Sequence, residues 1–290
     1  REALWAYGLI SPWIIGFLSF QFGPMLSSIF YSFTSYNIIM PWRWIGLSNY
    51  AEMASDRLVW QSLKVTSIYS VGSVTLNMVA SMFVAMVLNR NIKGLSWFRT
   101  LYYLPSVISG VSVSMLFMYI FNPEFGILNY LLWHLFHIQG PAWIYSEVWA
   151  IPSFVLMGLW GIGGGIIIYL AGLQGIPTEL YEAAEIDGAG GWKQFLHITL
   201  PMMSPVIYFQ LIMGIIGSFQ VFTQAYVMTQ GGPHYATWFY VLYLYYNAFR
   251  DFRMGYASAQ AWVLFILLVS LTILVTRTAS SWVHYEESVN

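Results

Sequence analysis

Glutamates recur every three residues over residues 179–185, within a polar segment, residues 179–201, that separates two long apolar runs. Glu179, Glu182 and Glu185 lie three residues apart, so on a helix they share one face near its positive N-terminal end. Pro177 is well suited to begin that helix, because the first helical position needs no N–H partner. A row of carboxylates on one helix face indicates charge-assisted contacts with another protein.

The rest of this segment predicts a two-helix hook. Ala183 and Ala184 have small side chains, so another protein could approach the backbone of the first helix closely. Gly188 is expected to break this helix, and a second short helix is expected over residues 192–200, where Pro201 ends it. The alternative is an ordinary polar loop between two membrane helices, which also needs some charge.

The composition is typical of a membrane protein. Hydrophobic residues make up 58% of the 290 residues, charged residues only 8%, and the mean hydropathy is +0.63. Too little charge exists to solvate a globular surface, so we expect one all-α integral membrane domain over residues 1–290. The net charge of −1 excludes a broadly basic nucleic-acid-binding protein, and the absence of cysteine excludes thiol catalysis and disulfides. The chain begins at Arg1 rather than Met, which is consistent with a preceding cytoplasmic tail, and no signal peptide is evident.

Long apolar runs predict the membrane-spanning helices, each of which needs about 20 residues. Pro12 and Pro24 are expected to kink the first of them. We expect six spans, over residues 4–33, 63–88, 100–123, 148–173, 205–228 and 255–276.

The loops indicate an orientation. The short loop that holds Arg90, Lys93 and Arg99 contains no acid, so it should be cytoplasmic by the positive-inside rule. The loop over residues 122–146 is rich in Trp and His, which suits the membrane interface on the opposite side. Six spans in this order place both termini in the cytoplasm.

The acidic segment also carries a family motif. Glu182, Ala183 and Ala184, then Gly188 and the run ITLP at 198–201, resemble the EAA loop of the inner-membrane permease subunits of bacterial ABC importers. YVMTQGGP resembles the MalF-like member of each permease pair in the carbohydrate-uptake branch, although the large periplasmic insertion of MalF itself is absent. The stretches that resemble this branch are GLSNY (46–50), FRTLYYLPSVISG (98–110), NPEFGILNYLL (122–132), LAGLQGIP (170–177), YVMTQGGP (226–233), MGYASAQAWVLF (254–265) and the tail WVHYE (282–286).

This resemblance implies a fold, a location and a set of partners. The fold is the six-helix MalF/MetI-like type I importer fold, in the bacterial cytoplasmic (inner) membrane. The partners are a second, homologous MalG-like permease, two cytoplasmic ATPase subunits, an extracytoplasmic solute-binding protein, the sugar and membrane lipid. ATP and Mg would belong to the ATPase, because this chain has no GxxxxGK[ST] to hold phosphates. No cofactor is therefore expected in this chain, and it is not expected to be an enzyme.

The resemblance also assigns roles to residues of the EAA loop, at about 174–204. Glu182 would meet a basic residue of the ATPase, and Gly188 would be the turn glycine. The implied coupling residues are Glu182, Ala183, Ala184, Asp187 and Gly188.

The spans on either side of this loop are implied to line the sugar path. Uncharged polar groups inside a membrane are functional candidates, and an aromatic ring can stack on a sugar. Helix packing is the alternative; it is favoured for the glycines, whereas packing and sugar contact stay equally open for Ser218 and Gln220. Glycines at 161, 164, 214 and 217 predict a wide site, or one formed mostly by the partner permease. The path candidates are Trp160, Gly161, Gly164, Gly217, Ser218, Gln220 and Gln224.

Two other groups have ordinary explanations. His134 and His137 could share a helix face, but beside two tryptophans they favour the membrane interface over a metal site. Arg250, Asp251 and Arg253 suit either a surface that faces the binding protein or a solvated loop.

The predicted function is import of a sugar, expected to be an oligosaccharide, by alternating access coupled to ATP hydrolysis through the EAA loop. The same machinery could carry an acidic oligosaccharide, which predicts basic residues along the cavity, or a polyol or glycosyl phosphate. An intramembrane enzyme would need acids or histidines at mid-depth, which the six spans lack. A passive channel or scaffold would not require Glu182.

Overall fold

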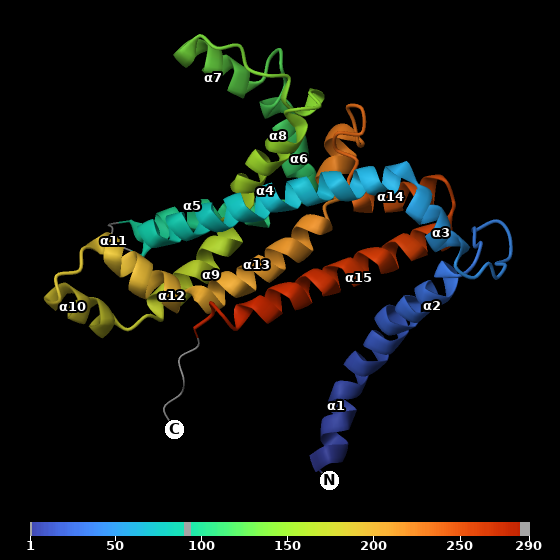
Figure 1. The fold of residues 1–290 in the computed structure, drawn as a ribbon, viewed down its shortest axis with the longest axis horizontal. Coiled ribbons are helices and arrows are strands. Elements are labelled where there is room, and N and C mark those ends of the chain that lie inside the picture. Colours follow the sequence, from blue (N-terminus) through green and yellow to red (C-terminus); the bar gives the residue numbers. More distant parts are fainter. Residues whose placement is uncertain (1, 90–93, 285–290) are drawn as a thin grey trace. The chain divides into compact units, whose positions relative to one another are not determined.

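The computed structural model describes residues 2–89 and 94–284, and the regular structure in those residues is helical (Figure 1). Short 3₁₀ and π turns interrupt the α-helices, and an isolated β-bridge joins Thr34 to Trp44. The all-α prediction is therefore confirmed. Arg90 and Lys93 of the basic loop, and the last two residues of the WVHYE tail, lie outside the described residues.

The chain forms two compact units. The first unit comprises Arg1–Trp60 and Tyr243–Val269. The prediction of one permease domain over the whole chain stays a prediction. The elements that lie wholly or partly in this first unit are α1 (Glu2–Phe17), η1 (Leu18–Phe22), α2 (Gly23–Ser32), α3 (Ser48–Ser55), α14 (Tyr240–Tyr245), η6 (Tyr246–Arg250) and α15 (Met254–Ala279).

The second unit comprises Gln61–Leu242 and Ser270–Asn290. Within it, α9 packs against α5 and α13, and α6 packs against η5. Its elements are most of α4 (Arg57–Leu88), α5 (Leu95–Val107), α6 (Gly110–Ile120), α7 (Ile127–Phe136), η2 (Trp143–Tyr145), α8 (Ala150–Gly158), η3 (Leu159–Gly161), α9 (Gly163–Gln174), α10 (Thr178–Ile186), α11 (Gly191–Gln194), η4 (Phe195–Thr199), α12 (Leu200–Met202), α13 (Ser204–Phe219) and η5 (Ala225–Thr229).

The described helices supply three unbroken candidate spans and three bent pairs. Trp5–Ser32, Arg57–Leu88 and Met254–Ala279 are each long and apolar enough to cross a membrane. Each bent pair passes the same test when its two helices are taken together, which gives up to six spans and matches the six-helix prediction. Pro12 lies inside α1 without a break, whereas the π turn η1 comes just before Pro24.

The structure corrects three spans that the sequence predicted as single helices: two of them are bent, and the third ends early. α5 and α6 meet at 99°, shortly after Pro105, which removes a backbone donor near the end of α5. The pair formed by α8 with η3 and by α9 bends by 54° within the glycine run that follows Trp160, where glycine lowers helix stability. The predicted fifth span, over residues 205–228, is also shorter than expected, since α13 ends at Phe219.

The second helix of the hook also differs from its prediction. It runs through α11, η4 and α12 to Met202, so Pro201 does not end it. Pro201 lies in the first turn of α12, where a missing N–H is tolerated. The chain bends instead by 64° at Met203, between α12 and α13.

A hydrophobic core beneath the hook joins α4, α9 and the start of α13. Tyr169 and Met203 are almost completely buried in it. Gly163 permits the close approach of α9 to α5, because a Cβ there would lie 2.3 Å from the Tyr102 carbonyl oxygen. α13 follows the hook directly in the chain, and its residues also line the cavity described next.

Candidate translocation cavity and coupling helix

A cavity of about 390 Å³ lies within the second unit. Residues of α4, α8, η3, α9 and α13, and of the segment after α13, contribute to its wall. No Asp, Glu, Lys, Arg or His is among the described residues that line it. The lining residues are Tyr69, Ser73, Val74, Asn77, Met78, Ser81, Gly158, Gly161, Ile162, Gly165, Gln210, Met213, Gly214, Gly217, Ser218, Val221 and Gln224.

The α4 side of the cavity is a polar ladder that the sequence analysis missed. Tyr69, Ser73, Asn77 and Ser81 are four residues apart, so they share one face of the helix. Asn77 donates a hydrogen bond from Nδ2 to Ser73 Oγ at 3.1 Å. Its Oδ1 is buried and has no hydrogen-bond partner among the described residues. The signal was present in the sequence as a polar stripe of period four in an apolar span.

Tyr69 connects this ladder to the opposite wall. Its hydroxyl shares hydrogen bonds with Ser73 and with Gln224, one of the predicted path residues. Gln224 immediately precedes the π turn η5. The ladder and the end of the fifth predicted span therefore form one polar surface.

Four of the predicted path residues line the cavity, namely Gly161, Gly217, Ser218 and Gln224. Ser218 is buried and its hydroxyl lies 2.6 Å from that of Ser70, a contact that joins α13 to α4. This contact supports the packing alternative for Ser218. At Gly161 and Gly217 a Cβ would meet no atom within 4 Å, so both glycines leave open space, as Gly164 also does.

Three predicted path residues lie outside the lining of this cavity. The Trp160 ring packs edge-on against Phe117, with centroids 6.1 Å apart. Gln220 is the exposed C-cap of α13, and Gly164 lies in the first turn of α9. Their roles in sugar transport stay predictions.

The predicted coupling helix is α10, Thr178–Ile186. Pro177 is its N-cap rather than its first helical residue. Gly188 has φ +75°, and the N–H of Ala189 returns to the Ala184 carbonyl at 2.8 Å, which ends the helix in a left-handed turn. A residue with a Cβ would be strained at this φ, so the turn explains the glycine.

The face of α10 that carries the acids is open. Glu179, Glu182 and Glu185 are exposed, as are Ala183 and Asp187, whereas Ala184 is half-buried. Ile186, at the end of the same helix, is 87% exposed. Three carboxylates beside an exposed apolar side chain form a surface suited to a basic partner protein.

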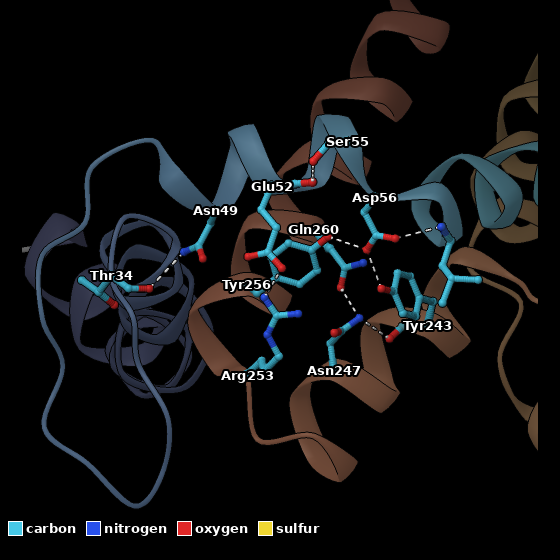
Figure 2. Close-up of polar contacts among 11 residues, drawn as sticks. Thr34, Asn49, Glu52, Ser55, Asp56, Tyr243, Asn247, Arg253, Tyr256 and Gln260 are labelled. Carbon is cyan, nitrogen blue, oxygen red and sulfur yellow. Dashed lines mark hydrogen bonds and ion pairs between the residues drawn. The ribbon is translucent and has the colours of Figure 1, made fainter.

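A polar cluster in the first unit connects α3, α14 and α15 (Figure 2). Asp56 accepts hydrogen bonds from Tyr243 at 2.5 Å and from Tyr256 at 2.8 Å. Burial raises the pKa of the Asp56 carboxyl, but these bonds and those from the backbone of Leu58 and Val59 outweigh burial. The pKa is therefore below its ordinary value of 3.8.

Two basic residues of the first unit, Arg250 and Arg253, are paired within the chain. Arg253 forms an ion pair with Glu52 and lies over the Tyr256 ring, 4.3 Å from its centroid (Figure 2). Arg250 pairs with Asp251 at 3.0 Å. Whether these residues face a binding protein stays a prediction. No group of three metal-ligating side chains occurs in residues 2–89 and 94–284, and His134 stacks on Tyr130.

A bundle of bent apolar helices around an uncharged polar cavity, together with an exposed acidic helix, defines a membrane permease. The chain belongs to the family of binding-protein-dependent transport system inner membrane components, whose model matches residues 77–283. The family consists of transport permeases of ABC importers rather than enzymes. This finding confirms the family expected from the EAA motif and the location in the inner membrane.

Known permeases resemble this chain over nearly its whole length. It is 43% identical over 290 residues to the probable ABC transporter permease protein YesP of Bacillus subtilis, with 99% of this chain and 94% of that protein covered. It is 32% identical to the multiple sugar-binding transport system permease protein MsmF of Streptococcus mutans, with 96% and 95% covered. A bacterial alginate ABC transporter, solved in complex with an alginate pentasaccharide-bound periplasmic protein, has a chain of the same fold, with a TM-score of 0.85, 23% identity, and 96% and 94% covered.

Proposed function

We propose that this chain is the sugar-translocating permease subunit of an ABC importer, and that its cargo is a neutral oligosaccharide. The observation that carries the proposal is the uncharged polar lining of the cavity. Hydroxyl and amide side chains can exchange hydrogen bonds with sugar hydroxyls, whereas an acidic cargo would call for basic side chains. The resemblance to a multiple-sugar permease supports the sugar class.

Alternating access would open this cavity in turn to the two sides of the membrane. The partners we propose are a second, MalG-like permease, two ATPase subunits that hold ATP and Mg, and an extracytoplasmic solute-binding protein. The second permease would complete the wall, because the cavity in this chain is open to one side. The exposed carboxylates of α10 would dock on the ATPase, which requires α10 and both termini to be cytoplasmic.

A reconstituted transporter tests the cargo. The complex is purified through this chain, placed in liposomes, and assayed for ATP hydrolysis with its binding protein and three ligand classes. These classes are neutral malto-oligosaccharides, oligogalacturonates and sn-glycerol 3-phosphate. Stimulation by the neutral class supports the proposal; stimulation only by an anionic class refutes the neutral cargo and assigns the charge recognition to the partner permease. A chain that purifies without any ATPase refutes the importer itself.

A further inference from the structure

Tyr181 is the large side chain of α10 that packs against the core of the second unit, whereas its neighbour Leu180 is exposed. Tyr181 is half-buried, and its hydroxyl lies 2.9 Å from that of Thr199. Thr199 is 7% exposed. The two hydroxyls therefore form a hydrogen bond that is partly shielded from solvent.

Thr199 lies where the chain changes from a π turn to an α-helix. It is the last residue of the π turn η4 and comes directly before α12, which meets α13 at the 64° bend. π turns are often found at functional sites. From this bend α13 continues without a break to Gly214 and Gly217 in the cavity wall. The Tyr181–Thr199 bond therefore connects α10 to η4, which continues through α12 and the bend into the helix that lines the cavity.

A second attachment of α10 is apolar. Tyr181 packs against a core that includes Leu173, Ile176 and Met203. α10 has nine residues, and a helix this short is marginal by itself, so its orientation depends on its attachments. Apolar packing is not directional, whereas a hydrogen bond is, so the hydroxyl pair fixes the rotation of α10 relative to η4.

We propose that the Tyr181–Thr199 hydrogen bond is the positioning contact that transmits a movement of α10 to α13. Tyr181 acts through Thr199 and touches neither sugar nor nucleotide. The proposal rests on the proposed function, in which the ATPase moves α10. If the two hydroxyls merely satisfied each other, removal of the bond would alter stability but leave the coupling of ATP hydrolysis unchanged.

The chain offers a matched control for this bond. Tyr208 on α13 makes a similar hydroxyl contact with Thr276 of α15, at 2.8 Å. Tyr181→Phe and Tyr208→Phe each remove one tyrosine hydroxyl from a Tyr–Thr pair. Thr199→Val removes the partner hydroxyl at constant shape, and Thr199→Ser retains it.

The first measurement is ATP hydrolysis by the whole transporter in nanodiscs, with and without binding protein and the three ligand classes above. Tyr181→Phe and Thr199→Val should each lower the stimulated rate about fivefold relative to the basal rate, the size expected for one neutral hydrogen bond. The double variant should be no worse than either single one. Tyr208→Phe and Thr199→Ser should resemble the wild type, and the ATPase should still co-purify with every variant.

The second measurement records the distance between α10 and α13 directly and needs no sugar. The chain has no cysteine, so spin labels can be placed at Ile186→Cys on α10 and Phe209→Cys on α13, both exposed. In the wild type, trapping with ADP and vanadate should leave one narrow distance distribution, because the helices move together. Tyr181→Phe should broaden it.

The outcomes separate the two proposals. A wild-type complex without ATP hydrolysis refutes the proposed function and this link with it. A coupled wild type with a Tyr181→Phe variant that behaves identically in both measurements refutes the link alone. If Tyr181→Phe fails to assemble, the comparison of Thr199→Val with Thr199→Ser decides: equal stimulation in these two overturns the proposal.

Discussion

Asn77→Leu should stabilise the empty permease and impair transport at the same time. Leucine is close to asparagine in shape, and it removes the buried Oδ1 that has no hydrogen-bond partner in the described structure. An unsatisfied buried acceptor costs about 1–3 kcal/mol, whereas the lost Asn77–Ser73 bond is worth about 0.5–1.5 kcal/mol. The difference predicts a net stabilisation of about 1 kcal/mol, or a rise of about 2 °C in melting temperature.

The same substitution should weaken sugar recognition. If a sugar hydroxyl donates to Oδ1 during transport, loss of this bond should raise the half-saturating sugar concentration about three- to tenfold. The assays are a thermal melt of the purified complex without sugar and uptake into liposomes at a series of sugar concentrations. Thr75→Val is the control, since Thr75 is exposed on another face of α4 and does not line the cavity. A variant that melts lower than the wild type and transports normally would refute the reasoning and make Asn77 a packing residue.

Three further predictions concern the other sites. Glu182→Lys should abolish co-purification of the ATPase, whereas Glu185→Gln, on the same exposed face, should retain it; equal binding by both variants would contradict a docking role for Glu182. Gly217→Leu should fill open space in the cavity and slow uptake of a long oligosaccharide more than of a disaccharide, so an equal effect on both would argue against a sugar path there. The pKa of Asp56 is below 3.8, so the carboxylate contributes its full stabilisation above that pH and loses it as the pH falls through the folded-state pKa. In the wild type the melting temperature should therefore fall between pH 5 and about pH 2, and Asp56→Asn should reduce this fall. An unchanged profile of melting temperature against pH would refute the role assigned to Asp56.

The sequence predicted the elements whose signals are local. The apolar runs predicted all six candidate spans, and the spacing of Glu182, Ala183, Ala184 and Gly188 predicted the helix α10 and its terminal turn. These signals depend on composition and on backbone conformation at single positions. Neither kind of signal depends on which helices are neighbours in the fold.

The bends and the cavity depend on tertiary packing, which explains why they were predicted less well. A proline such as Pro105 is compatible with a kink, a break or a continuous helix, and the neighbouring helices decide among these. Trp160 and Ser218 were chosen from one helix at a time, yet Trp160 packs on Phe117 and Ser218 on Ser70. The polar ladder on α4 lies in a span that is not adjacent to the EAA loop in the chain, so only its period of four pointed to it, and that period does not show that the stripe faces a cavity.

The length of α13 explains how a small movement at the hook could alter the cavity. From Ser204 to Ser218 the helix rises about 21 Å, so a tilt of about 5° at the bend moves its far end by about 2 Å. The Ser70 and Ser218 hydroxyls are 2.6 Å apart, and such a movement would take them beyond hydrogen-bonding distance. This contact should therefore form in one state of the transport cycle and break in another, so that its loss reports that a displacement at α10 has reached the cavity.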